Sequence, residues 1–77
     1  MSQSFDAEVD AIGLNCPLPI LKTKQALNRM HSGQVLHIMT TDPSSEIDFA
    51  VFAQRSQNEL LDSREENGTF HFILRKA

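Results

Sequence analysis

The sequence predicts a two-layer α/β (α+β) sandwich of order βαβαββ, in which two helices cover one face of a four-stranded mixed sheet. Two segments of helical periodicity are interleaved with segments whose apolar and polar residues alternate as in strands. The pair Asn67-Gly68 is typical of a tight hairpin turn before a final strand. Right-handed crossovers place both helices on the same face of the sheet. We expect the 77 residues to form a single domain, residues 1–77.

The first strand and the first helix are expected within residues 5–30. Residues 5–11 alternate apolar and polar side chains strictly, which predicts a half-buried strand. Residues 18–30 predict a helix, with apolar side chains at helical spacing at Ile20, Leu21, Leu27 and Met30. Gly33 is expected to mark the stop after this helix.

A second strand and a second helix are expected within residues 35–58. Residues 35–41 are rich in β-branched and apolar side chains and predict a strand, with Leu36, Ile38 and Thr40 on one face. Asp42 is expected to cap a helix over residues 44–58 with Pro43 at its first position. Its inward side chains are predicted to be Ile47, Val51 and Phe52.

The last two strands are expected at residues 60–65 and 69–75. In the final strand Phe70, Phe72 and Leu74 alternate with more polar positions, so these three are predicted to face the helices. The opposite sheet face has no predicted cover. It would carry Val35, Met39 and Ile73, and apolar patches of this kind often mark interfaces.

Composition and charge exclude several classes of protein. The net charge is −3, so bulk charge does not indicate direct binding to nucleic acid. No apolar run approaches the about 20 residues of a membrane span, and the N-terminus lacks the pattern of a signal peptide. The single cysteine excludes an internal disulfide framework and favours the cytoplasm. The three histidines are scattered singly, so we expect no metal site.

The run Asn15-Cys16-Pro17-Leu18-Pro19 contains the strongest chemical signal. We expect Cys16 at the N-cap of the first helix, with Pro17 and Pro19 at its first and third positions, where missing N–H groups cost little. The thiolate is the reactive form of cysteine, and a helix N-terminus favours an anion. With the Leu18 N–H pointing at the sulfur, the pKa of Cys16 is predicted to be modestly lowered.

Cys16 and the two lysines that follow it also have simpler interpretations. A free cysteine is commonly a small buried hydrophobe, although the two prolines and the helix start favour an exposed thiol here. Lys22 and Lys24 follow Cys16 closely on the predicted helix. They are most simply a solvated face, and they would also suit the docking of an acidic partner or a phosphate backbone.

The segment around Cys16 resembles the signature of the TusA (SirA-like, YedF-like) family of small sulfur carriers. The resemblance rests on the run Asp10-Ala11-Ile12-Gly13-Leu14-Asn15-Cys16-Pro17-Leu18-Pro19 and continues through Gly33, Thr40-Thr41-Asp42-Pro43, Asp48 and Arg75-Lys76. It implies a βαβαββ sandwich in which Cys16 holds a persulfide and no other cofactor is needed. Gly13, Leu14, Pro17 and Pro19 would shape the turn, and Asp10, Asp42 and Asp48 would support it.

The resemblance also implies partners. A cysteine desulfurase or a rhodanese-type protein would donate the sulfur, and a downstream protein would accept it, in one branch toward thiolation of tRNA. The resemblance leaves the enzyme question open: the chain would be a sulfurtransferase only in the sense of a persulfide carrier, rather than a multiple-turnover enzyme. The expected second helix lacks the proline and the cysteine that tRNA-thiolation members tend to carry after the aspartate, which leaves the pathway open.

Two other functions remain open from the residues. The chain could be a regulatory or protein-interaction module that uses the open sheet face, with Cys16 incidental. It could also be a redox partner that forms mixed disulfides through Cys16.

Overall fold

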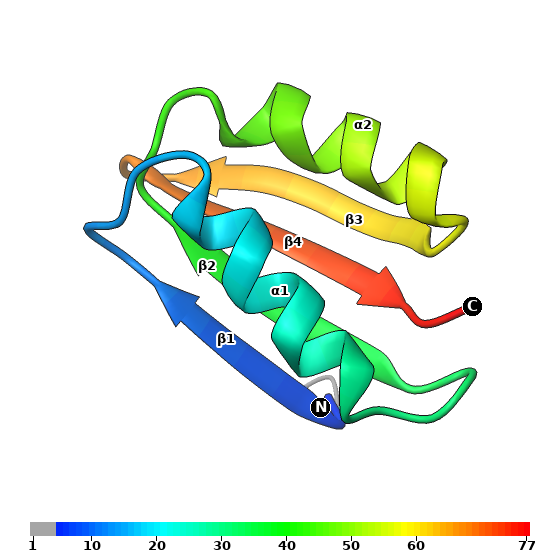
Figure 1. The fold of residues 1–77 in the computed structure, drawn as a ribbon. Helices are drawn as coiled ribbons and strands as arrows, with labels where there is room; N and C mark the ends of the chain where they lie inside the picture. The colour runs from blue at the N-terminus through cyan, green and yellow to red at the C-terminus, as the bar shows by residue number, and fades with distance from the viewer. Residues whose placement is uncertain (1–4) are drawn as a thin grey trace.

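The computed structural model describes residues 5–77 and shows the predicted elements in the predicted order (Figure 1). They are β1 (Ala7–Ala11), α1 (Leu18–Asn28), β2 (Val35–Thr40), α2 (Ser45–Ser56), β3 (Glu59–Glu66) and β4 (Thr69–Arg75). The four strands form one mixed sheet of order β1-β2-β4-β3, and both helices lie on one of its faces. The predicted two-layer sandwich is confirmed.

The topology explains why two distant loops meet. Strand β1 is parallel to β2, whereas β4 is antiparallel to both β2 and β3. Because β1 and β2 run the same way, both end at the same edge of the sheet, where the chain turns into α1 and α2. The predicted hairpin joins β3 to β4, and both of its turn residues have positive φ, 54° at Asn67 and 84° at Gly68.

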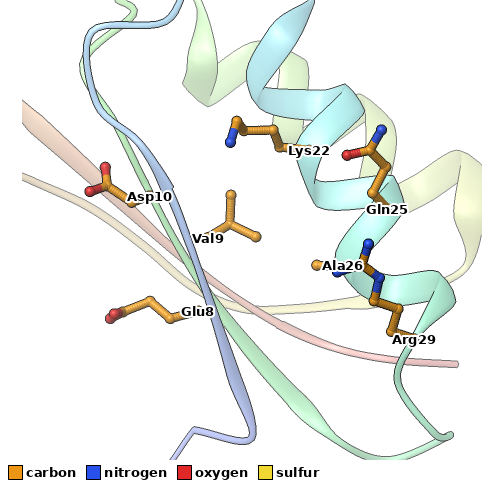
Figure 2. A pocket seen from close by; sticks show the side chains of 7 residues that line it. All are labelled: Glu8, Val9, Asp10, Lys22, Gln25, Ala26 and Arg29. Atoms are coloured by element: carbon orange, nitrogen blue, oxygen red, sulfur yellow. The ribbon is translucent and has the colours of Figure 1, made fainter.

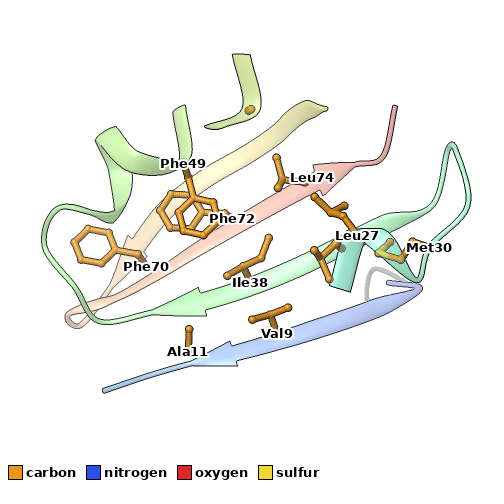
Figure 3. Packing of buried hydrophobic residues seen from close by; sticks show 11 residues of the cluster. Val9, Ala11, Leu27, Met30, Ile38, Phe49, Phe70, Phe72 and Leu74 are labelled. Atoms are coloured by element: carbon orange, nitrogen blue, oxygen red, sulfur yellow. The ribbon is translucent and has the colours of Figure 1, made fainter. Parts of the chain in front are cut away.

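The core lies between the sheet and the two helices (Figure 3). Its centre is Phe49 of α2, which stacks on Phe72 of β4 with ring centroids 4.4 Å apart. The inward positions of β2 and β4 were predicted correctly, because strand alternation fixes which side chains share a face. The buried apolar cluster consists of Val9, Ala11, Leu27, Met30, Leu36, Ile38, Phe49, Ala53, Phe70, Phe72 and Leu74.

The predicted inner faces of the helices were partly wrong. In α2 the buried residues are Ser45, Phe49 and Ala53, whereas Ile47 is 72% exposed and Val51 is also exposed. Burying the large Phe49 removes more apolar surface, and the small residues one turn away on either side let the helix approach the sheet. In α1 the predicted inward residue Leu21 is exposed, and Thr23 is buried instead, with its hydroxyl donating to the Pro19 carbonyl at 2.8 Å.

The helix starts also differ from the prediction. Helix α1 begins at Leu18 with Pro17 as its N-cap, so Cys16 lies one residue before the cap and Pro19 is at the second position. Helix α2 begins at Ser45 with Ser44 as its N-cap, two residues after Asp42. The first helix ends at Asn28, and Gly33 lies in the turn before β2 rather than directly after the helix.

The open sheet face is mostly polar. Among the described residues the predicted apolar patch is reduced, because Ile73 is only 5% exposed and Val35 and Met39 are half-buried. The centre of this face holds His37 and His71, whose Nε2 and Nδ1 atoms lie 3.0 Å apart. No helix of the described residues is long and apolar enough to cross a membrane.

Candidate functional site

Cys16 lies in the loop between β1 and α1, beside the loop that joins β2 to α2 (Figure 1). Its side chain is exposed, so the reading as a buried hydrophobe is wrong. The sulfur therefore sits where the carboxyl ends of two parallel strands meet the start of two helices. Crevices at the carboxyl ends of parallel strands are common places for function in α/β proteins.

Two hydrogen bonds tie the neighbouring loops together. The Gly13 N–H donates to Thr41 Oγ1 at 2.9 Å, and the Cys16 N–H donates to Asp42 Oδ2 at 2.7 Å. Gly13 has a φ of 82°, which L side chains rarely adopt, so a glycine is needed for the turn that presents its N–H to Thr41. The backbone position of the thiol is thus set by the second loop as well as by its own.

The loop is also braced from within. The Leu14 N–H donates to the Ala11 carbonyl at 3.2 Å, and the Leu14 side chain packs against the core. The Leu18 N–H donates to the Asn15 carbonyl at 2.9 Å and not to the sulfur, so that part of the prediction is wrong. The Cys16–Pro17 peptide bond is cis.

Three side chains form a polar cluster beside the Cys16 loop. Asp42 Oδ1 accepts from both the N–H and the hydroxyl of Ser44, at 3.1 and 3.0 Å. The same hydroxyl lies 3.1 Å from Asp48 Oδ2. A hydroxyl has one proton to donate, so the two carboxylates share the Ser44 donor. The resemblance named Asp42 and Asp48 as supporting residues, and the structure brings both to the Cys16 site.

This cluster reverses the predicted acidity of the thiol. The pKa of Cys16 is raised, first because the Asp48 side chain accepts a hydrogen bond from the thiol, and further by desolvation and by the charges of Asp48 and Asp42. A carboxylate next to a thiol disfavours the thiolate. The prediction of a lowered pKa failed because these two aspartates, far away in the sequence, outweigh the start of α1.

The pKa of Asp42 is lowered, chiefly because its carboxylate accepts the backbone N–H groups of Ser44 and Cys16. Hydrogen bonds to the charged form of an acid favour that form. Asp42 therefore remains an anion that clamps the Cys16 backbone.

The thiol opens into a shallow groove between α1 and α2, which we call the thiol groove. Its volume is about 300 Å³. Its floor is largely apolar, and Lys24 and Arg55 supply two cations at its wall. The residues that line it are Cys16, Pro17, Ile20, Lys24, Asp48, Val51, Phe52 and Arg55.

The two lysines predicted to act together are separated. Lys22 lines a second groove, of about 310 Å³, between β1 and α1, together with Arg29 and Asp10 (Figure 2). In this view Val9 points toward α1, whereas Glu8 and Asp10 point away from it. Asp10 supports the turn after β1, because its Oδ1 accepts the Ile12 N–H at 3.1 Å. It does not line the thiol groove.

Sequence reasoning missed Thr41, Ser44 and Arg55. The first two lie in the loop after β2, next to the predicted Asp42. The signal that could have found them is the parallel pairing of β1 and β2, which brings the loops after these strands together. Arg55 is one turn beyond Val51, and only the packing of α2 on α1 places it beside Lys24.

The comparisons with known proteins agree on one family. The family model described as "Sulfurtransferase TusA" matches residues 7–76. A sulfur carrier protein TusA of Allochromatium vinosum is 59% identical over 95% of this chain and 96% of its own length. A putative sulfur carrier protein of Neisseria meningitidis is 41% identical over 86% of this chain and 89% of its own.

A solved structure supports the fold independently. The crystal structure of a SirA-like protein from Desulfitobacterium hafniense superposes with a TM-score of 0.79 and 21% sequence identity. The match covers 90% of this chain and 95% of that one.

Proposed function

The chain belongs to the family of the sulfurtransferase TusA, and from this premise we propose that it is a sulfur carrier that holds a persulfide on Cys16. The observation that carries the proposal is an exposed thiol, the single one in the sequence, whose backbone is clamped by Asp42. A relay needs a sulfur that a partner can reach in a defined direction. It also needs no second thiol in the chain that would close an internal disulfide.

The raised pKa suits a carrier that acts on contact with a partner. With Asp48 and Asp42 beside it, the empty carrier rests mainly as a thiol, which is a weaker nucleophile than a thiolate. A persulfide is a stronger acid than a thiol, so the loaded carrier bears an anion near the same two carboxylates. Repulsion between these charges favours handing the sulfur on.

The donor that we propose is the persulfide of a cysteine desulfurase or a rhodanese-type protein, and the acceptor is a further protein thiol. Thiolation of tRNA is one destination of the sulfur that fits this chemistry. A reducing cytoplasm is the compartment in which a lone thiol would stay available. The persulfide is the sole group that this function needs at the site.

The decisive experiment is the transfer of sulfur itself. The full chain is incubated with a cysteine desulfurase and cysteine, and its intact mass is recorded under nonreducing conditions. We expect a gain of one sulfur atom that is reversed by a reductant. Cys16→Ser should show no gain.

Gain of the same mass by Cys16→Ser would refute the assignment of the site. No gain by the wild type with a desulfurase and with a rhodanese-type donor would refute the carrier function. Disulfide adducts without a persulfide would instead support the mixed-disulfide alternative.

A further inference from the structure

The two carboxylates beside the thiol differ in how many of their oxygen atoms already accept hydrogen bonds. Among the described residues that line the thiol groove, Asp48 is the one carboxylate. It comes from the first turn of α2, whereas Cys16 comes from the loop before α1. Asp48 is half-buried and Cys16 is exposed, so a partner can reach the sulfur more readily than the carboxylate.

Asp42 is occupied by the backbone. Its Oδ2 holds the Cys16 N–H at 2.7 Å and its Oδ1 holds the Ser44 N–H at 3.1 Å. These bonds lower the pKa of Asp42 and keep it charged. Asp42 is therefore a poor candidate for taking up a proton, and its role is to fix the position of the loop.

Asp48 is held more loosely. Its Oδ2 lies 3.1 Å from the Ser44 hydroxyl, whose one proton can turn to Asp42 instead. A carboxylate has about four acceptor positions, so this contact leaves Asp48 able to accept the thiol proton. Cys16 and Asp48 line the same groove, and the Asp48 side chain is the main reason that the pKa of Cys16 is raised.

We propose that Asp48 is the proton acceptor for Cys16 during sulfur uptake. This inference rests on the proposed function, because it concerns the same thiol. Asp48 holds the S–H in the resting carrier and takes the proton as the sulfur attacks. The Ser44 hydroxyl can donate to Asp42 while Asp48 takes the proton.

The step balances without any further reagent. A lone pair of Cys16 Sγ forms a bond to the outer sulfur of the donor persulfide. The bond between that sulfur and the donor cysteine breaks, and its electron pair leaves with the donor as a thiolate. The proton moves from Sγ to Asp48 and then to the departing thiolate. No oxidant or reductant is consumed, because one persulfide is exchanged for another.

The test uses two reactions that share the Cys16 nucleophile. Asp48→Asn keeps the size of the side chain and removes its charge and its basicity. Reaction with iodoacetamide at pH 7 should become faster, because the thiolate is no longer disfavoured. Persulfide uptake from a desulfurase should become slower, by about 10²-fold if Asp48 acts as a general base of ordinary strength. Asp48→Glu should restore part of the uptake.

The pH profile separates this role from a structural one. Uptake by Asp48→Asn should follow the thiolate fraction and rise about tenfold per pH unit below the pKa of the thiol. Wild-type uptake should depend on pH less steeply. Asp62→Asn removes one carboxylate from β3, and we expect it to change neither reaction.

The proposal is overturned if Asp48→Asn speeds alkylation and uptake together, because Asp48 would then only suppress the thiolate. It is also overturned if uptake by Asp48→Asn equals that of the wild type at every pH. Failure of the wild type to load sulfur from either donor would refute the carrier function itself. The alkylation of the two proteins would still be measurable in that case, so the two failures are distinguishable.

Discussion

Two polar clusters, one where β1 and β2 lead into the helices and one on the open sheet face, are built in different ways. The cluster at the thiol, formed by Cys16, Asp42, Ser44 and Asp48, is open to solvent and shares one hydroxyl proton between two acids. The cluster on the open sheet face is a chain from Glu8 through His37 to His71. Glu8 Oε2 lies 2.8 Å from His37 Nδ1, and the His37 Nε2 lies 3.0 Å from His71 Nδ1.

The two histidines of this chain are hydrogen-bonded and largely buried, whereas the Glu8 side chain is 56% exposed. The side chains of His37 and His71 are only 12% and 18% exposed. Their rings are nearly parallel at 7°, with centroids 5.2 Å apart. The rings meet through their nitrogen atoms, 3.0 Å apart, rather than face to face. This edge-to-edge arrangement is the one that a hydrogen bond between them requires.

The difference indicates that the histidine cluster stabilises the fold, whereas the thiol cluster serves sulfur transfer. Buried polar groups contribute to a fold when their hydrogen bonds are complete. At the thiol the acids oppose the reactive form of the cysteine, and none of the residues 5–77 covers the apolar groove beside it. We therefore expect substitutions in the thiol cluster to reduce sulfur uptake and substitutions in the histidine cluster to reduce stability.

The largest expected contrast is between Cys16→Ser and His37→Ala. Cys16→Ser should abolish persulfide formation and leave the denaturant midpoint of unfolding unchanged, because the side chain is exposed. His37→Ala should keep persulfide formation at the wild-type rate. Intact mass after incubation with a desulfurase and circular dichroism in urea measure the two effects. Loss of uptake in His37→Ala, with the fold intact, would break the comparison.

The second effect is the stability lost in His37→Ala. The substitution removes the partner of His71 Nδ1 and the ring that stacks on Phe5 at 4.7 Å between centroids. Leaving a buried polar group unpaired costs about 1–3 kcal/mol. Urea unfolding at pH 8 checks the value. A variant as stable as the wild type would mean that the histidine chain contributes nothing to the fold.

A smaller effect is expected in the wall of the thiol groove. Val51 and Leu61 are 42% and 44% exposed, but only Val51 lines this groove. If partners dock there, Val51→Ser should raise the protein-donor concentration needed for half-maximal uptake by about fivefold, equivalent to ~1 kcal/mol at an interface. Leu61→Ser is the matched control and should leave this concentration unchanged. Equal behaviour of the two variants would argue against docking in the groove.

The smallest expected effect concerns acid stability. Because the folded state lowers the pKa of Asp42, the charged carboxylate stabilises the fold above the unfolded pKa of about 4. This contribution is lost as the pH falls through the folded pKa. Asp42→Asn should therefore be less stable than the wild type at pH 7, and the difference should shrink toward pH 2. Urea midpoints across this range test it, and a difference that is constant with pH would contradict the assignment.

Much of the fold was predictable because the signals are local. Alternation along β2 and β4 gave the correct inward residues, and Asn67-Gly68 gave the hairpin, since each depends only on nearby dihedral preferences. The inner face of α2 was not predictable in the same way. Ile47 with Val51 and Phe49 with Ala53 have the same spacing, and only contact with Phe72 selects the second pair.

By itself, the sequence determined the order of the elements, the two-layer fold and the single thiol held before a helix by prolines. Those features follow from periodicity, turn residues and composition, which depend only on the residues and their order in the sequence. Only the tertiary structure decided the chemical state of that thiol. Asp42 and Asp48 reach Cys16 because β1 and β2 are parallel neighbours, and a charge acts through distance in space rather than separation in sequence.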